Sequence, residues 1–294
     1  MNTAPLPDSV QNALLAFLQN TFRHRLQDTH PLLLNGIPLG RLTASWRQRL
    51  QQDWTGRLQA RADGLLLETD SWHDMAAMLQ ETARRWHEAG YFGGWRGEQC
   101  DVHDGGGHLL FTLERSAFRP LGLASRAVHI NGCCETPAGL RFWIARRSPH
   151  KAVDPGKLDN LTGGGIAAGE TSVCAMYRET WEEAGIPPDT AAAAHPAECL
   201  FSSHPVRRGL HREYLHIFDL RLPHGFTPQN QDGEVASFSL MTAEDTAAAI
   251  VQGKMMNDSA LVTLDFFRRL GLVSPQHPLA EYLQSFQSTG VEAV

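Results

Sequence analysis

The sequence of 294 residues lacks the features that mark several large classes of protein. Its five cysteines, an odd number, include no C-x-x-C spacing, which argues against a disulfide framework and against a structural zinc site. It has no long run of Lys or Arg, and its net charge is −6. This charge balance argues against a general nucleic-acid binder and against a polybasic membrane segment.

Long apolar runs are also missing. No stretch approaches the roughly 18 apolar residues of a membrane span, and the first residues do not follow the pattern of a signal peptide. Internal repeats and low-complexity tracts are absent from the sequence as well. We therefore expect an unprocessed cytoplasmic protein whose partner is a small molecule, with no nucleic acid and no membrane.

The length of the chain exceeds that of a typical single domain, and 42% hydrophobic residues suffice for a packed core. We predict an N-terminal α+β domain over residues 1–120 and a second domain over 121–294. Residues 1–8 are expected to be loosely packed. The elements predicted for the first domain are a helix over 10–26, a hairpin over 32–42 that turns at Asn35 and Gly36, a strand over 65–68 and a helix over 71–89.

The second domain alternates strands with helices. Its predicted strands cover residues 127–131, 140–146, 215–222 and 235–241, and its last two predicted helices cover 243–252 and 259–270.

The stretch from Gly163 to Pro188 carries the densest set of chemically capable side chains. It reads GGGIAAGETSVCAMYRETWEEAGIPP and contains a predicted helix over about 172–184. Thr171 or Ser172 can cap its start, and Gly185 followed by two prolines ends it. The spacing predicts one buried face, formed by Val173, Met176, Tyr177, Thr180 and Ala184. A separate acidic face lies about a third of a turn away and is formed by Glu179, Glu182 and Glu183.

These three glutamates stand at i, i+3 and i+4, where like charges destabilise an isolated helix by roughly a few tenths of a kcal/mol per pair. A cation among them would relieve the repulsion, and Arg178 can neutralise only part of the charge. A hard divalent ion with oxygen ligands, Mg²⁺ or Mn²⁺, is the economical partner. The alternative is a solvated acidic face, which is the commoner state of glutamate clusters on helices.

The whole spacing favours the metal site over the solvated face. Gly164, Glu170, Arg178-Glu179, Glu182-Glu183 and Gly185-Ile186 reproduce the signature of the Nudix hydrolase family, G-x5-E-x7-R-E-U-x-E-E-x-G-U. The chain resembles that family, with one departure at Thr180, where the signature prefers a bulky aliphatic residue. The resemblance implies an α/β fold, an α/β/α sandwich around a mixed sheet, preceded here by the smaller α+β domain. It also implies a metal-dependent hydrolase of a diphosphate, or pyrophosphate, bond.

Segments outside the signature resemble one subgroup of the family. They are WRGEQCDV from Trp95, ERSAFRPLGLASRAVHINGC from Glu114, ARRSPHKAVDPGKLDNLTGGG from Ala145 and DGEV from Asp232. The subgroup comprises the Nudix domains associated with fungal thiamine diphosphokinase, together with stand-alone relatives. The resemblance implies that oxo and oxy analogues of thiamine diphosphate are cleaved to the monophosphate and phosphate.

The resemblance also implies roles for single residues. Glu179, Glu182 and Glu183 are the expected metal ligands, and the backbone carbonyl of Gly164 completes the shell. Arg178 is expected to orient Glu179 through a charge-assisted hydrogen bond.

Two further glutamates have open roles. Glu170 either supports the ligands or belongs to the helix N-terminal turn, where the helix dipole favours negative charge. Glu234, in the turn over 232–235, resembles the extra carboxylate that many Nudix enzymes place near the metals as ligand or general base; the alternative is a solvated loop residue. Glu179, Glu182 and Glu234 all stay candidates for the group that takes the proton of the attacking water.

Basic and aromatic residues outside the helix are weaker candidates. Arg146, Arg147 and Lys151 follow a predicted strand and precede the glycine loop, so we expect one of them to contact the diphosphate; an ordinary basic turn is the alternative. His129 is expected to be structural. Residues 95–98 either line a heterocycle pocket or serve core packing and local hydrogen bonding.

Other functions stay open on the same scaffold. ADP-ribose or an NADH-type dinucleotide is the alternative substrate, because the signature recognises the diphosphate and not the attached group. An isomerase of isopentenyl diphosphate needs a catalytic cysteine near the glycine region, and LDNLTGGG offers none. A non-catalytic diphosphate-binding module is disfavoured by the intact set of acidic residues. A homodimer is the oligomeric state that we keep as an expectation.

Overall fold

The computed structural model describes residues 4–22 and 28–288 of the chain. Its larger part is built on a mixed sheet in which β11, β12, β7, β8 and β13 follow one another, with β10 paired to β7 and β9 to β8. β12 runs parallel to β7, and the other neighbours are antiparallel. The strands are β7 Ser125–Thr136, β8 Gly139–Arg147, β9 Leu158–Asp159, β10 Thr162–Gly165, β11 His195–Val206, β12 Gly209–Arg221 and β13 Val235–Met241.

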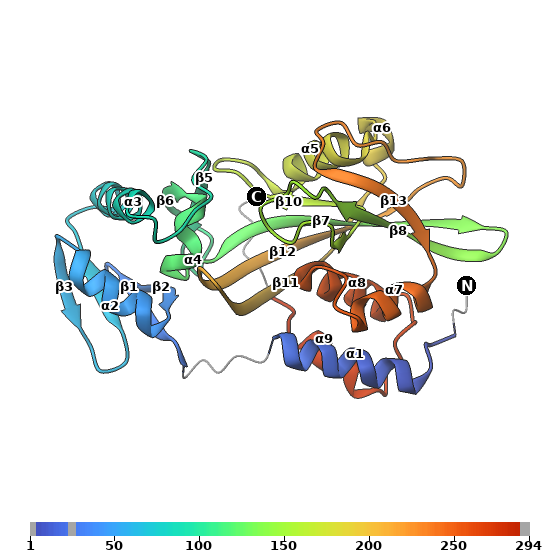
Figure 1. Cartoon of the computed structure of the whole chain (residues 1–294), viewed down its shortest axis with the longest axis horizontal. Coiled ribbons are helices and arrows are strands. Elements are labelled where there is room, and N and C mark those ends of the chain that lie inside the picture. Colours follow the sequence, from blue (N-terminus) through green and yellow to red (C-terminus); the bar gives the residue numbers. More distant parts are fainter. Residues whose placement is uncertain (1–3, 23–27, 289–294) are drawn as a thin grey trace.

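Helices cover both faces of this sheet (Figure 1). On one face α5 and α6 lie over a core that includes Val128 and Met176. On the other face α1, α7, α8 and α9 lie over a second core that includes Leu215 and Ile217. The predicted α/β fold, an α/β/α sandwich around a mixed sheet, is confirmed. The helices of the larger part are α5 Ser172–Ala184, α6 Pro188–Ala191, α7 Ala243–Val251, α8 Asn257–Arg269 and α9 Pro278–Gln284.

A smaller four-stranded sheet, ordered β2-β1-β4-β3, lies in the N-terminal part of the chain and has a core of its own. Its first hairpin turns at Asn35 and Gly36, as predicted, and both residues have positive φ, 46° and 84°, which two-residue hairpin turns favour. Helix α3 is capped by Ser71, as predicted, whose Oγ accepts from the N–H of Asp74 at 3.1 Å. The elements are β1 His30–Leu34, β2 Ile37–Leu42, α2 Ala44–Asp53, β3 Arg57–Ala60, β4 Leu65–Glu68 and α3 Trp72–Glu88.

A two-stranded ribbon, β5 Gln99–His103 and β6 Leu109–Glu114, leads through the short helices η2 Arg115–Ala117 and α4 Phe118–Leu121 into the large sheet. Strand β5 contacts the segment that precedes α5. The carbonyl of Gln99 accepts from the N–H of Ala168 at 2.9 Å, and Oδ2 of Asp101 accepts from the N–H of Gly169 at 2.9 Å. The N-terminal part therefore helps to position the loop before the acidic helix.

The first helix, α1 Asp8–Thr21, packs with the C-terminal helices, because Leu14 and Leu18 belong to the core beneath α7, α8 and α9 (Figure 1). Leu6 is also buried, and its N–H donates to the carbonyl of Leu272 at 2.9 Å. The expectation of loose packing is wrong for this part of the chain, since the hydrophobic side chain of Leu6 is covered. Residues 1–3 and the predicted helical residues 23–26 lie outside the described residues. The division at residue 120 stays a prediction.

The remaining predicted strands and helices are found at β4, β7, β8, β12, β13, α7 and α8, with ends that differ by a few residues for several of them. The described elements that were not predicted are α2, β3, β5, β6, η2, α4, β9, β10, α6, β11 and α9. In the described part of the chain, no helix combines the length and the apolar character that crossing a membrane requires.

Candidate active site at the acidic helix

Helix α5 begins and ends where the sequence predicts. Its N-cap is Thr171, whose Oγ1 accepts from the N–H of Cys174 at 3.1 Å. Its C-cap is Gly185 at φ 60°, a left-handed conformation that favours glycine. The N–H of Ile186 then donates to the carbonyl of Thr180 at 3.1 Å. These caps fix the helix, and with it the relative positions of its glutamates.

The face that α5 buries differs from the predicted one. Met176 and Thr180 are buried as predicted, but Val173 is 46% exposed, whereas Glu179 and Glu183 are 7% and 4% exposed. The prediction that the acidic face is separate from the buried face is therefore wrong. The physical reason lies in β10, a strand made mainly of glycine, whose missing side chains leave room for two carboxylates against the sheet.

Gly163 and Gly164 of β10 form the seat for these two carboxylates. The N–H of Gly163 donates to Oε2 of Glu183 at 2.9 Å. A Cβ added at Gly164 would lie 2.0 Å from Oε1 of Glu179 and 2.3 Å from its Cδ, so this position admits only glycine while Glu179 stays in place. These glycines therefore have a direct role in seating the carboxylates: Gly163 donates a hydrogen bond to Glu183, and Gly164 leaves the space that Glu179 occupies.

Arg178 binds the acidic residues on one side of the cluster. Its Nε and Nη2 donate to the two oxygens of Glu170, each at 2.9 Å, which is a bidentate pair. Its Nη1 donates to Oε1 of Glu179 at 2.6 Å and to Oε2 of Glu182 at 3.3 Å, and Nη2 also reaches the carbonyl of Gly165 at 3.1 Å. The hydrogen bond with Glu170 above all, and the nearby charges, hold the pKa of Arg178 well above its ordinary value.

The contacts of Glu170 distinguish its two proposed roles. Besides the pair with Arg178, its Oε2 accepts from the N–H of Ala167 at 3.0 Å. Hydrogen bonds from Arg178 and Ala167 lower the pKa of Glu170, although burial opposes this shift as the largest single effect. In this structure Glu170 binds Arg178, and Arg178 binds Glu179. Glu170 therefore orients the arginine that orients Glu179.

Lys151 lies on the other side of the cluster. Its Nζ forms an ion pair with Glu234 and lies 3.8 Å from Oε1 of Glu183. Burial lowers the pKa of Lys151 below its ordinary value, while the charge of Glu183 opposes the shift. Of the three basic residues proposed for the substrate, Lys151 is the one whose ion pairs include the acidic cluster.

Arg146 and Arg147 hold the loop that carries Lys151. Nη1 of Arg146 donates to the carbonyl of Gly156 at 2.8 Å. Nη1 of Arg147 donates to Oδ2 of Asp159 at 2.8 Å, and its guanidinium also bonds to the loop backbone. The contact of either arginine with a diphosphate stays a prediction, since the structure gives both of them partners within the loop and strand β9.

Burial raises the pKa of Glu183 to about 8, with a smaller effect from the charge of Glu179. Burial also raises the pKa of Glu179, against the opposing charge of Arg178. Both shifts indicate that too little positive charge lies near Glu179 and Glu183 to offset the cost of burying their ionised carboxylates.

The charge of this cluster fits a divalent cation. Among the described residues, only Arg178 and Lys151 form ion pairs with the five carboxylates of the cluster, which belong to Glu170, Glu179, Glu182, Glu183 and Glu234. The donors are hard carboxylate oxygens, which suit Mg²⁺ or Mn²⁺. The glutamates of α5 do not bring three ligand oxygens within 4.8 Å of one another, and the one described group that meets this distance lies elsewhere. The ligand set of Glu179, Glu182, Glu183 and the Gly164 carbonyl therefore stays a prediction.

Sequence reasoning missed the residues that brace the glycine strand. A Cβ at Gly165 would lie 2.9 Å from Cζ of Arg115, so this guanidinium packs directly on the strand. Nη1 of Arg115 donates to Oε2 of Glu98 at 3.1 Å. Asp101 holds the loop before α5 and accepts from Nη2 of Arg126 at 3.2 Å. These contacts join the N-terminal part of the chain to the acidic site, and no local sequence pattern predicts them.

His129 and residues 95–98 have the surroundings of structural residues. Nδ1 of His129 lies 2.9 Å from Oδ1 of the buried Asn160. The indole of Trp95 stacks on the imidazole of His87, with 5.4 Å between ring centroids. Arg96 forms a long ion pair with Glu98 at 3.8 Å. A heterocycle pocket built by these residues stays a prediction.

A cavity of about 460 Å³ lies beside the loop that carries Glu234. Trp143 and Phe238 supply aromatic walls, and Asn230 supplies a polar group. The indole Nε1 of Trp143 is buried and has no hydrogen-bond partner in the described part of the chain. Aromatic walls near an unused donor suit a flat, partly polar group of a ligand.

Comparison with known proteins finds matches to this region. Residues 128–259 match the family model described as the NUDIX domain. The chain is similar to Nudix hydrolase 24, chloroplastic, of Arabidopsis thaliana, with 39% identity over 171 residues that cover 58% of this chain and 47% of the relative. It is also similar to Nudix hydrolase 20, chloroplastic, of the same plant, with 34% identity over 61% of this chain and 48% of the relative. The chain spans about half the length of these curated relatives.

Solved structures resemble the fold more distantly. A protein of Deinococcus radiodurans shares 22% identity, covers 64% of this chain and 99% of its own, and has a TM-score of 0.42. The NUDIX domain of Shewanella oneidensis NrtR, complexed with ADP ribose, shares 17% identity, covers 50% of this chain and 88% of its own, and has a TM-score of 0.40.

Proposed function

We propose, from the premise that residues 128–259 form a NUDIX domain, that this chain hydrolyses the phosphoanhydride bond of a small organic diphosphate. The observation that carries the proposal is the seating of Glu179 and Glu183 on Gly164 and Gly163, with Arg178 bonded to the first of them. This arrangement concentrates carboxylates that lack compensating charge at one place, which is what a diphosphate hydrolase needs to bind divalent cations.

The chain's own residues have distinct tasks in this proposal. Glu179, Glu182 and Glu183 would hold Mg²⁺ or Mn²⁺, and Arg178 orients Glu179 and favours its ionised form against the effect of burial. When bound there, the ion would lower the pKa of a water molecule and balance the charge of the diphosphate oxygens. Lys151 forms ion pairs with Glu183 and Glu234 and would donate to a diphosphate oxygen in this proposal.

The exposure of the carboxylates narrows the choice of general base. The side chains of Glu182 and Glu234 are 44% and 39% exposed, whereas those of Glu179 and Glu183 are 10% and 6% exposed. A base must reach a water molecule, so Glu182 and Glu234 are the stronger candidates. The water oxygen adds to a phosphorus atom, the bridging P–O bond breaks, and the base takes the proton, which gives a monophosphate and inorganic phosphate.

We propose oxo or oxy analogues of thiamine diphosphate as the substrate. The support is the resemblance of the segments around residues 95–102, 114–133, 145–165 and 232–235 to the subgroup associated with thiamine diphosphokinase. The aromatic cavity at Trp143 and Phe238 adds a site for a flat heterocycle beside the loop of Glu234. ADP-ribose and NADH-type dinucleotides are the competing substrates, because the acidic cluster recognises only the shared diphosphate.

A comparison of three substrates tests the proposal. Oxythiamine diphosphate, ADP-ribose and NADH are incubated with the full chain and Mg²⁺, and the released phosphate and monophosphates are measured. The thiamine compound should have the highest kcat/KM. Preferential cleavage of ADP-ribose or NADH would overturn the substrate assignment, and no cleavage of any of the three would overturn the hydrolase.

Variants of the two exposed carboxylates identify the base. Glu182→Gln and Glu234→Gln are compared with Glu281→Gln, a matched change at an exposed glutamate of α9. Loss of the base should lower kcat by about 10²-fold or more, whereas the control should retain wild-type turnover. Normal activity in both Glu182→Gln and Glu234→Gln would contradict the assignment.

A further inference from the structure

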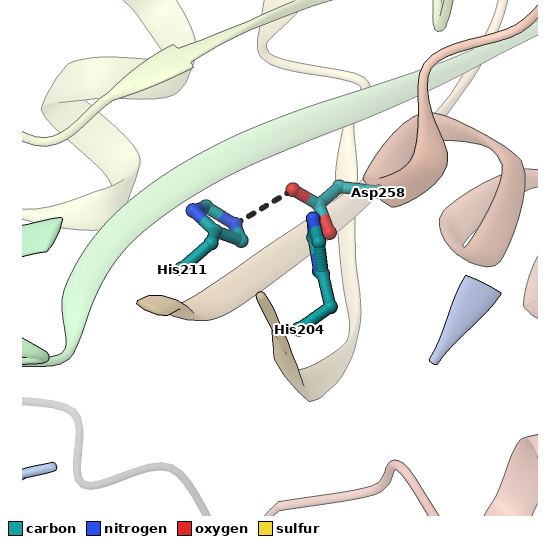
Figure 2. A group of neighbouring side chains, drawn as sticks. All are labelled: His204, His211 and Asp258. Carbon is teal, nitrogen blue, oxygen red and sulfur yellow. Dashed lines mark ion pairs between the residues drawn. The ribbon is translucent and has the colours of Figure 1, made fainter. Parts of the chain in front are cut away.

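A second cluster of chemically capable side chains lies far from the acidic helix in the fold. His204 of β11 and His211 of β12 are directly opposite each other in the antiparallel pair, and Asp258 is in the first turn of α8. Figure 2 shows both imidazoles beside the carboxylate of Asp258. Each residue offers one potential ligand atom, and these atoms lie within 4.8 Å of one another. All three residues are buried, with exposures of 7%, 3% and 8%.

The cluster belongs to the face of the sheet opposite α5. Residues 215 and 217 of β12, which alternate in step with His211 and Glu213, pack in the core beneath α8. The residues of β12 that point the other way pack beneath α5. The cluster is therefore separated from the proposed hydrolase site by the sheet itself.

The contact between His211 and its acidic neighbours has an unusual geometry. Nε2 of His211 lies 2.8 Å from Oδ2 of Asp258 and 3.6 Å from Oε2 of Glu213. Nevertheless this buried nitrogen has no partner with hydrogen-bond geometry among the described residues. The 2.8 Å contact is an ion pair when His211 is protonated, drawn as a dashed line in Figure 2, but the direction of the ring nitrogen does not meet hydrogen-bond geometry. Ligands of one metal ion have this arrangement, because each lone pair points at the ion and not at the neighbouring ligand.

The spacing also suits a small ion. Zn²⁺ binds nitrogen and carboxylate oxygen at about 2.0–2.2 Å, so neighbouring ligand atoms of a tetrahedral site lie about 3.3 Å apart. The separations of 2.8 Å and 3.6 Å around His211 bracket that value.

Serine hydroxyls hold the outer oxygen of both carboxylates. Oγ of Ser202 donates to Oδ1 of Asp258 at 2.5 Å, and Oγ of Ser125 donates to Oε1 of Glu213 at 2.6 Å. Each carboxylate thereby keeps its second oxygen toward His211. Hydrogen bonds of this kind orient the ligands of metal sites in proteins.

Two buried carboxylates lie beside His211. Asp258 and Glu213 are both buried, and Asp258 forms an ion pair with His211 when this imidazole is protonated. In a metal-bound site both imidazoles would be neutral, and the two carboxylates would balance the charge of one divalent ion, which would take the place of a proton on His211.

We propose that His204, His211 and Asp258, with Glu213 as the fourth ligand, bind a structural Zn²⁺. The ion would connect the β11–β12 hairpin to the start of α8. Imidazole ligands select a transition metal over Mg²⁺ or Ca²⁺, and a closed set of four protein ligands is typical of structural zinc. The site departs from the expectation based on cysteine spacing, because it uses no cysteine.

The test uses the full chain and measures the metal itself. Protein purified from a zinc-supplemented culture is dialysed, and bound metals are quantified by mass spectrometry. X-ray absorption at the zinc edge then reports the ligands of the wild-type protein without any substitution. We expect a single Zn²⁺ per chain, with scattering from two imidazoles. Iron in place of zinc, no retained zinc, or zinc without imidazole scattering would each overturn the proposal.

Matched variants locate the ion. His211→Gln and Asp258→Asn should abolish retention of zinc, and Ser202→Ala should weaken its affinity about 10- to 100-fold. His195→Gln, at an exposed histidine of the same strand β11, should retain zinc, as should Glu179→Gln at the acidic site. Circular dichroism of each variant verifies folding. Zinc retention by folded His211→Gln and Asp258→Asn would show that His211 and Asp258 are not ligands and that the cluster is an ordinary buried ion pair.

Discussion

Replacement of Gly164 by alanine gives a sharp prediction, because the structure shows which atoms collide. The new Cβ would lie 2.0 Å from Oε1 of Glu179, whereas ordinary van der Waals contact begins at 3.4 Å. The carboxylate must therefore retreat by about 1.4 Å, the difference between these two distances. Since a misplacement of about 1 Å can cost about 10²-fold in rate, kcat of Gly164→Ala should fall by about 10²-fold.

The same substitution should leave the protein folded. The retreat of Glu179 disturbs its hydrogen bond with Arg178, and the loss of a bond to a charged group costs about 1.5–3 kcal/mol. Phosphate release from the preferred diphosphate measures turnover, and thermal unfolding measures stability. Gly225→Ala is the matched control, because no atom lies within 4 Å of the Cβ position there.

A double variant separates the collision from any backbone effect. In a Glu179→Ala background the carboxylate is missing, so adding Gly164→Ala should no longer lower stability. An equal loss of stability in both backgrounds would refute the collision with Glu179. Turnover of Gly164→Ala within a few-fold of the wild type would refute the seating of this carboxylate as a requirement for activity.

Three further predictions address the charged partners of the cluster. Arg178→Lys loses the bidentate pair with Glu170, so kcat should fall about tenfold or more in a phosphate-release assay; unchanged kcat would refute the positioning role. Lys151→Met should raise KM for the diphosphate more than it lowers kcat, and an unchanged KM would remove Lys151 from substrate binding. Glu183 has a pKa of about 8 in the folded chain against 4.5 as the ordinary value, so the folded state binds more protons between these limits. Stability of the metal-free protein should therefore fall as pH rises from about 4.5 to about 8, and Glu183→Gln should flatten this part of the curve in thermal unfolding with a chelator present; equal slopes would contradict the burial of an uncompensated carboxylate.

The sequence predicted α5 well because its ends have local causes. Thr171 caps one end and Gly185 adopts the left-handed conformation at the other, and both residues act within one turn of the helix. The same holds for the turn at Asn35 and Gly36, and for Ser71 at the start of α3. Where a few neighbouring residues determine the conformation, the local sequence pattern is sufficient to predict it.

The buried face of α5 has no such local cause. Helical spacing places Val173 with the apolar residues, yet it is 46% exposed, and Trp181 is 51% exposed. The face that packs is chosen by β10, whose glycines admit Glu179 and Glu183. Such a choice depends on contacts between segments, so hydrophobic spacing along one helix could not reveal it.

Other missed elements have weak patterns of their own. Helix α2 reads ASWRQRLQQD and buries only Leu50 among its residues, so it has almost no apolar stripe. Strand β11 contains Pro196 and Pro205, which argue against a strand in the sequence. Its place beside β12 at the edge of the large sheet explains why prolines are tolerated there.

The candidate metal-binding residues differ in the same way. Four carboxylates of the proposed hydrolase site stand within 14 residues of sequence, from Glu170 to Glu183, and form a recognisable signature. His204, His211 and Asp258 come from two strands and a helix, and their spacing matches no motif. Only the folded chain brings them together.

The origin of the product oxygen shows whether the acidic cluster directs a water molecule to a phosphorus atom. The preferred diphosphate is incubated with the full chain and Mg²⁺ in water enriched in ¹⁸O, and the products are followed by ³¹P nuclear magnetic resonance. We expect a monophosphate and inorganic phosphate, one of which carries a single ¹⁸O, and no reaction after Glu179→Gln together with Glu183→Gln. An unchanged phosphoanhydride with the wild-type chain, or equal cleavage by the double variant, would contradict the hydrolase function of this cluster.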